Sequence, residues 1–126
     1  MVEQLVDVRS PREFKPGQID IDAELFKLAH NLKVLTKRIM DCGSLCVELE
    51  HKYNKCQLDI GINMSESELA TLGIVKSDRF KIAKLKCADE KKALDEMQNK
   101  YRYFVNMKDT YQEWVNVYKK TRLGHE

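Results

Sequence analysis

Positive side chains gather in one short stretch of the sequence. Residues 76–86 carry five basic residues against the single acidic Asp78. The basic residues are Lys76, Arg79, Lys81, Lys84 and Lys86. A compact group of Lys and Arg neutralises phosphates and releases their condensed counterions, so it can bind a nucleic-acid backbone without reading base sequence. The alternative for such a run is an ordinary solvated helix face.

Two further lysines, Lys52 and Lys55, come to lie near this cluster if the chain folds back as a hairpin. The net charge is only +2, from 22 Lys and Arg against 20 Asp and Glu, so the chain as a whole is not a polycation. Affinity for nucleic acid therefore depends on local clustering. We predict a nucleic-acid-binding surface formed by Lys52, Lys55, Lys76, Arg79, Lys81, Lys84 and Lys86.

The four cysteines are the next candidates for chemistry. Cys42, Cys46, His51 and Cys56 follow one another at close spacing, and Cys87 stands apart. A zinc site would use Cys and His ligands, but close ligand pairs usually flank a turn and these four residues share one predicted helix. Because no secretory leader precedes them, we expect reduced thiols packed as small core residues, with a disulfide or a metal as the alternatives. We predict no metal and no cofactor.

Catalytic residues are not recognisable in the sequence. The three histidines, His30, His51 and His125, are isolated from one another: the first two lie on the first predicted long helix and the third near the C-terminus. The sequence contains no phosphate-cradling Gly-rich loop, no Ser/His/Asp order and no paired-carboxylate signature. We therefore predict that the protein is not an enzyme.

A long helix is predicted from Asp20 or Asp22, either of which can cap its first turn, to about Ile60. Apolar side chains recur in steps of three and four, which is the pattern of a coiled-coil or bundle seam. These positions are Leu25, Leu28, Leu32, Leu35, Ile39, Cys42, Cys46, Leu49, Tyr53, Cys56 and Ile60. Gly43 lies inside the run and weakens the helix by about 1 kcal/mol relative to Ala.

In the second half of the sequence, residues 61–64 interrupt the apolar pattern. Ser65 and Glu68 then form a capping box that predicts a short helix over 65–72. A second long helix is predicted from Ser77 or Asp78 to about Tyr118 or Lys120. Its seam positions are Phe80, Ala83, Cys87, Glu90, Leu94, Met97, Tyr101, Phe104, Lys108, Tyr111, Val115 and Tyr118. The polar seam residues Glu90 and Lys108 are typical of positions that fix helix register.

These elements predict an all-α fold: a long helical hairpin over residues 20–126, with a short connecting helix and coiled-coil-like seams. Residues 1–19 are predicted to form an N-terminal arm, because Pro11, Pro16 and Gly17 stop regular structure. We expect the arm to stay loose or to pack on a neighbouring subunit.

The apolar faces of the hairpin are too wide for one copy to cover. We therefore expect the protein to complete its core as a homo-oligomer. The predicted oligomer or core seam comprises Leu32, Leu35, Ile39, Leu49, Phe104, Tyr111, Trp114 and Tyr118.

Composition narrows the class of protein. With 43% hydrophobic and 33% charged residues, and only 5 Gly and 2 Pro, the chain is neither disordered nor a turn-dense all-β protein. No apolar run approaches the ~18 residues of a membrane span. We expect a cytoplasmic protein with no membrane partner.

Several short elements occur in the order found in a known family. Ile19-Asp20 leads into a first helix with Ala29-His30-Asn31, and Ser77-Asp78-Arg79-Phe80 leads through Ala88-Asp89 into a long aromatic-bearing helix. In these elements and in its size the chain resembles the UvsY-type phage recombination mediators, over most of residues 19–122. It departs from them in its four cysteines and in the two prolines of its arm.

The resemblance implies an all-helical ring that binds single-stranded DNA and loads a strand-exchange recombinase onto DNA coated by a single-strand-binding protein. It places DNA-binding lysines near the end of the first helix, at Lys52 and Lys55. We therefore predict a non-catalytic single-stranded-DNA-binding accessory protein that acts as an oligomer in recombination or replication. One alternative is a coiled-coil adaptor or small phage inhibitor that binds a host or defence protein. Another is a small metal-dependent protein.

Overall fold

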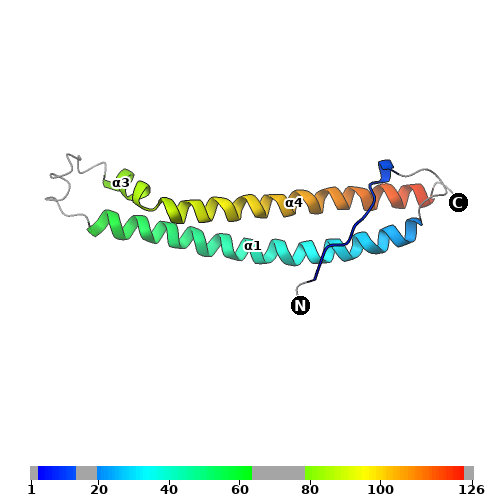
Figure 1. The fold of residues 1–126 in the computed structure, drawn as a ribbon, viewed down its shortest axis with the longest axis horizontal. Helices are drawn as coiled ribbons and strands as arrows, with labels where there is room; N and C mark the ends of the chain where they lie inside the picture. Colours follow the sequence, from blue (N-terminus) through cyan, green and yellow to red (C-terminus); the bar gives the residue numbers. More distant parts are fainter. Residues whose placement is uncertain (1–2, 14–19, 64–78, 124–126) are drawn as a thin grey trace. The chain divides into compact units, whose positions relative to one another are not determined.

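The computed structural model describes residues 3–13, 20–63 and 79–123. Regular structure in these residues is entirely helical (Figure 1): a 3-10 turn at Pro11–Glu13, α1 at Ile21–Asn63, α3 at Arg79–Lys86 and α4 at Ala88–Leu123. The long helices α1 and α4 pack against each other with the short α3 between them in sequence, so the predicted all-α fold is confirmed. The predicted helix over 65–72 lies outside the described residues. None of the described helices is both long enough and apolar enough to pass through a membrane.

The start of α1 follows the predicted capping chemistry. The backbone N–H of Ala23 donates to a carboxylate oxygen of Asp20 at 3.2 Å, and the N–H of Glu24 donates to the Asp20 carbonyl at 3.1 Å. Asp20 is therefore the N-cap, because it satisfies backbone donors that have no partner within the helix. The helix then runs through Gly43 without ending.

The second predicted long helix is divided in the structure. A turn at Cys87 separates α3 from α4, and the helix axis changes direction there (Figure 1). Backbone hydrogen bonds still bridge the turn, from the Cys87 N–H to the Ala83 carbonyl at 3.0 Å and from the Lys91 N–H to the Cys87 carbonyl at 3.1 Å. The turn lies at the residue that joins this segment to α1, as described below.

The chain forms two compact units, and both long helices contribute to each. The arm unit comprises Met1–Asp41 and Tyr101–Glu126, and the disulfide unit comprises Cys42–Lys100. In the arm unit, Leu28, Val115 and Tyr118 form the buried centre of the core. Partly buried side chains of the arm and both helices pack around them: Val8, Ile21, Leu25, Leu32, Tyr111 and Trp114.

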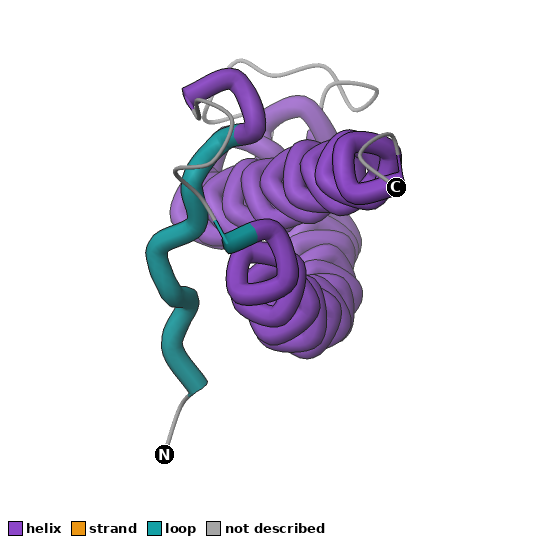
Figure 2. The backbone as a smooth tube through the Cα atoms, turned by 90° about the vertical axis from the view of Figure 1, so that its right-hand side faces the viewer, coloured by secondary structure: helices purple, strands orange, loops and turns teal. Residues whose placement is uncertain are grey.

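The arm is held by its own chain, in contrast to the expectation that it stays loose or packs on a neighbouring subunit. Residues 3–10 run in an extended path beside the helices of the arm unit (Figure 2). The fully buried Asn31 side chain accepts from the Val6 N–H at 2.9 Å and donates to the Val6 carbonyl at 2.8 Å. Glu24 accepts the Arg9 N–H at 3.1 Å, and the Tyr118 hydroxyl donates to the Arg9 carbonyl at 2.6 Å. Side chains of the helices thus satisfy an arm backbone that has no strand partner.

In the disulfide unit, the buried hydrophobic side chains of the described residues are Cys42, Ala83, Cys87 and Leu94. A disulfide joins Cys56 on α1 to Cys87 at the α3–α4 turn, with 6.1 Å between the two Cα atoms. The expectation of reduced thiols at both positions is therefore wrong. The two residues come from different predicted helices, and the packing of the two seams brings them together.

The seams are covered largely within one chain. Among the described seam residues, only Tyr101 is exposed, and the rest are buried or half-buried. The predicted contact residues Leu35, Phe104 and Tyr118 are buried, and Leu32, Ile39, Leu49, Tyr111 and Trp114 are half-buried. The seams themselves therefore leave little apolar area that a second copy must cover.

Candidate nucleic-acid interface

The predicted basic residues all fall in the disulfide unit. Lys52 and Lys55 are exposed on α1, whereas α3 carries Arg79, Lys81, Lys84 and Lys86. The three α3 lysines are exposed and Arg79 is half-buried. Lys76 lies outside the described residues. Two groups that are separated in the sequence are thus brought into one compact unit.

The disulfide fixes how near these two groups are. Lys55 precedes Cys56, and Lys86 precedes Cys87. Because the cysteine Cα atoms are 6.1 Å apart and neighbouring Cα atoms are 3.8 Å apart, the Cα atoms of Lys55 and Lys86 lie within about 14 Å of each other. At this separation, one segment of a nucleic-acid strand can contact both lysines through their long side chains.

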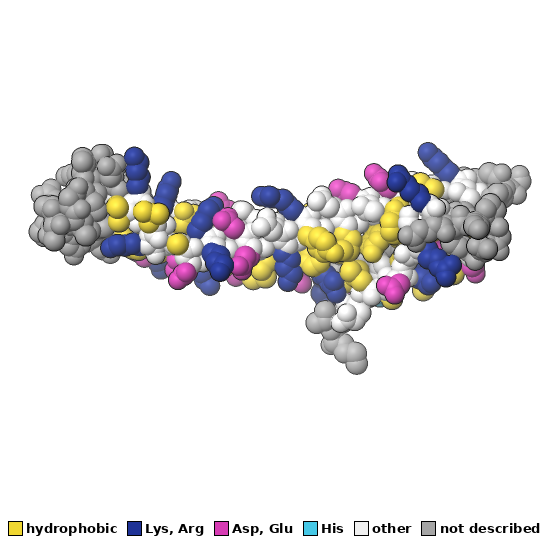
Figure 3. All heavy atoms as spheres, turned by 45° about the horizontal axis from the view of Figure 1, so that its top comes forward, with side chains coloured by type: hydrophobic (Ala, Val, Ile, Leu, Met, Phe, Trp, Pro, Cys, Tyr) yellow, Lys and Arg dark blue, Asp and Glu magenta, His cyan; other side chains and the backbone are white. Residues whose placement is uncertain are grey.

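The composition of α3 makes it the most strongly basic element of the unit. Half of its eight residues are Lys or Arg, and none is acidic. Ala83 is buried, whereas Lys81, Lys84 and Leu85 project into solvent. Figure 3 shows Lys and Arg side chains beside hydrophobic ones at this end of the unit, and further Lys and Arg side chains over the rest of the visible face. The arrangement offers exposed positive charges with an exposed leucine beside them, and exposed lysines suit contact with a phosphate backbone.

Acidic side chains reduce the positive potential around Lys52 and Lys55. A pocket of about 390 Å³ is lined by both lysines together with Asp59 and Glu90. Lys91 is already engaged, because its ammonium group pairs with Asp95 at 3.2 Å and lies over the Tyr53 ring. Among the described helices of the unit, α3 is the one whose own sequence contains basic residues and no acidic residue.

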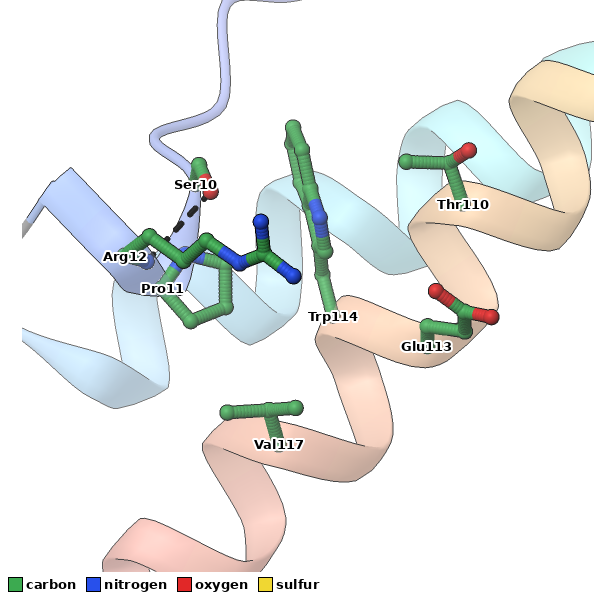
Figure 4. A pocket seen from close by; sticks show the side chains of 7 residues that line it. All are labelled: Ser10, Pro11, Arg12, Thr110, Glu113, Trp114 and Val117. Atoms are coloured by element: carbon green, nitrogen blue, oxygen red, sulfur yellow. Dashed lines mark hydrogen bonds between the residues drawn. The ribbon is translucent and has the colours of Figure 1, made fainter.

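A larger pocket lies in the arm unit, where the arm meets α4. It has a volume of about 460 Å³ and is lined by Ser10, Pro11, Arg12, Thr110, Glu113, Trp114 and Val117. Figure 4 shows the Arg12 guanidinium beside the Trp114 indole and Glu113 turned away from it. The lining offers apolar walls and two opposite charges, but no His or Cys that would serve a nucleophilic reaction.

Among the residues that the structure describes, Cys46 and Tyr111 have a clearly shifted pKa. Burial raises the pKa of the Cys46 thiol, and nearby Cys42 and Glu50 raise it further. Burial likewise raises the pKa of the Tyr111 hydroxyl, with Tyr103 and Asp7 adding to the shift. Both shifts favour the neutral form, so neither residue is prepared to act as a nucleophile at neutral pH.

Sequence reasoning missed the polar residues that hold the arm. Glu24 and Asn31 are buried in line with Leu28 and Leu35, at the spacing of four, three and four that marks the core face. A carboxylate and an amide at core positions are the signal that could have revealed a backbone segment packed over them. His30 belongs to the same set, since its ring contacts the Gln4 carbonyl at 2.8 Å.

Comparison with known proteins does not identify a family for this chain. No family model, curated protein or solved structure matches the chain. The functional assignment therefore depends on the residues themselves, and the resemblance to UvsY-type mediators stays a prediction.

Proposed function

We propose that the protein is a non-catalytic accessory protein that binds single-stranded DNA through the basic surface of its disulfide unit. This surface comprises Lys52, Lys55, Arg79, Lys81, Lys84 and Lys86, with Lys76 as a sequence neighbour. The observation that carries the proposal is the presence, in one unit, of the acid-free helix α3 and the α1 lysines. Because lysines contact phosphate without selecting a base, the expected binding is independent of sequence and weakened by salt.

The protein acts in this proposal as an oligomer in the cytoplasm. Three exposed apolar side chains of the disulfide unit, Val47, Leu58 and Ile62, support self-association. Their spacings of eleven and four residues place them on one face of α1. Copies that meet along this face would repeat the basic surface, and repeated weak sites bind one strand far more tightly than a single site.

The cellular role that follows is assistance to a recombination or replication system. The resemblance to UvsY-type phage mediators supplies the protein partners of this role, a strand-exchange recombinase and a single-strand-binding protein. This extension depends on the resemblance alone, whereas DNA binding depends on the charges of the disulfide unit.

A salt titration of binding to a fluorescent single-stranded oligonucleotide tests the proposal. The affinity should fall steeply between 50 and 200 mM salt (roughly the range over which phosphate contacts are lost). In the double variant Lys84→Ala/Lys86→Ala, the magnitude of the slope of log K against log salt should fall by about 1.4, because each single-strand phosphate contact contributes about 0.7.

The matched control removes two exposed lysines of the arm unit, in the variant Lys33→Ala/Lys37→Ala. It changes the net charge by the same amount but should leave the slope nearly unchanged. Absence of binding at low salt, or equal losses in both variants, would reject the disulfide unit as the interface.

The second candidate is an adaptor or inhibitor that binds another protein. The same exposed face of Val47, Leu58 and Ile62 favours it, since apolar residues on one helical face are typical anchors for a groove on a partner. A monomer in solution that ignores DNA, with Val47→Lys abolishing capture of a defined protein partner, would select this function over the first.

A further inference from the structure

We propose that reduction of the Cys56–Cys87 disulfide converts its surroundings into a binding site for zinc or a similar thiophilic divalent metal, with Cys56, Cys87 and Glu90 as ligands. This site lies in the disulfide unit and goes beyond the proposed DNA binding. None of the lysines of α3 belongs to it.

The donor atoms are already grouped. The sulfurs of Cys56 and Cys87 and a carboxylate oxygen of Glu90 all lie within 4.8 Å of one another. A tetrahedral zinc ion, with bonds of about 2.3 Å to sulfur and 2.0–2.2 Å to oxygen, holds such atoms roughly 3.5–4 Å apart. Opening the disulfide and small side-chain rotations are enough to reach that spacing.

The helices supply these ligands from fixed positions. Cys87 and Glu90 are three residues apart at the start of α4, so their side chains share one side of the first turn. Cys56 faces them from α1 with 6.1 Å between the cysteine Cα atoms. Ligands on two packed helices are held more precisely than ligands on a loop.

The surroundings provide access and a fourth ligand position. Cys56 and Glu90 line the pocket of about 390 Å³, together with Asp59, Lys52 and Lys55. Water from this pocket or the Asp59 carboxylate can complete the coordination sphere. Two thiolates and one carboxylate leave a dication site with one net negative charge, and Lys52 and Lys55 balance this charge together with that of Asp59.

Cys56 and Cys87 either form the disulfide or coordinate the metal, and they cannot do both at once. A dithiol reductant donates two electrons to the S–S bond and becomes a disulfide itself, and the two cysteine sulfurs take up its two protons. Metal binding then releases these protons to solvent as each sulfur coordinates as a thiolate. In both states a bridge joins α1 to the start of α4.

Titration of the full-length chain with Co²⁺ and then Zn²⁺, before and after anaerobic reduction, tests the inference. The reduced chain should bind one metal ion and show the sulfur-to-cobalt charge-transfer band and the visible bands of a tetrahedral site. Zinc should displace the cobalt signal. The oxidised chain should show neither band, since its disulfide sulfurs are not thiolates.

Three variants locate the ligands. Glu90→Gln should lower the affinity at least ~10-fold, because even outer-shell partners of metal sites are worth ~10- to 100-fold. Cys87→Ser should abolish the charge-transfer band, whereas Cys46→Ser, which removes a free thiol outside the cluster, should change nothing. Circular dichroism confirms that each variant is folded, and Glu90→Gln retains both cysteines.

Two results would overturn the proposal. One is a reduced chain that binds no cobalt, and the other is cobalt binding that is lost in Cys46→Ser but not in the other two variants. Salt-dependent DNA binding of the oxidised chain is measured separately and does not bear on this result.

Discussion

Different interactions hold the helices together in the two units. The largest fully buried side chains of the described residues include Tyr118, Leu28, Leu35 and Asn31, all in the arm unit, against only Cys87 in the disulfide unit. The arm unit therefore gains its stability from large apolar burial and from an arm fastened by buried polar groups. In the described part of the disulfide unit, a covalent link joins α1 to the α3–α4 turn.

This difference has a consequence for the surface. In the arm unit, Asn31, Glu24 and Tyr118 bind the arm backbone and are no longer available to a ligand. In the disulfide unit, lysines of α1 and α3 stay exposed around the cross-link. We infer that the first unit gives rigidity and the second provides the binding surface.

The strongest test of the contrast is Tyr118→Ala. Removal of a fully buried aromatic side chain should lower the free energy of unfolding by about 4 kcal/mol. Chemical denaturation measures the loss, and Tyr118→Phe, which deletes only the hydroxyl bonded to the Arg9 carbonyl, should lose about 1 kcal/mol. Hydrogen exchange should rise mainly in the arm unit, and an equal rise in both units would contradict the division.

Reduction in the absence of metal should have the next largest effect. The cross-link spans 31 residues, and opening it should lower the stability of the disulfide unit by about 3.7 kcal/mol in the chain-entropy account. Thermal unfolding with and without reductant measures this change. The same reductant should leave Cys87→Ser unaffected, and an effect in that variant would point to a cause other than this bond.

Asn31→Ala should release the arm. The substitution removes both hydrogen bonds to Val6 and should lower stability by about 2 kcal/mol, since the Val6 groups lose their partner. Limited proteolysis within residues 3–13 should become faster, while cleavage in the disulfide unit stays unchanged. Asn31→Asp retains one acceptor and should lie between the two. Unchanged cleavage of the arm would show that apolar contacts alone hold it.

Loss of the α1 cap should be a smaller effect. Asp20→Ala removes the acceptor of the Ala23 N–H and should lower the free energy of unfolding by about 1 kcal/mol, whereas Asp20→Asn should retain most of it. Denaturant titration of the three proteins is sufficient. If Asn behaves like Ala, the capping contact makes no contribution.

Alkaline pH should weaken the arm unit slightly through Tyr111. Its pKa is raised in the folded chain by burial, so the folded state holds this proton more tightly than the unfolded state. The contribution is complete below the ordinary tyrosine pKa of about 10 and is lost as pH rises through the higher folded value. Unfolding measured on either side of pH ~10 should show a loss that Tyr111→Phe removes. A loss of equal size in Tyr111→Phe would assign the effect to another group.

Local sequence patterns were sufficient to predict the long helices. Apolar steps of three and four predicted α1 and most of α4, and Asp20 predicted the first cap, because helix periodicity and capping depend on residues a few positions apart. The described seam positions are accordingly buried or half-buried, apart from Tyr101.

Contacts between distant residues could not be predicted in the same way. Pairing of Cys56 with Cys87 depends on the register of two helices across an intervening segment, which periodicity leaves open. The contacts of Asn31 and Glu24 depend on an arm that has no pattern of its own. The turn at Cys87 interrupts a seam that reads as continuous in the sequence.

Hydrogen exchange of the oxidised chain, with and without a single-stranded oligonucleotide at low salt, tests most directly whether the disulfide unit is the binding surface. We expect the oligonucleotide to add protection from exchange in α3 and in α1 around Lys52 and Lys55, and to cause no change in the arm unit. Protection confined to the arm and α4 around Arg12 and Trp114, or no protection anywhere, would contradict it.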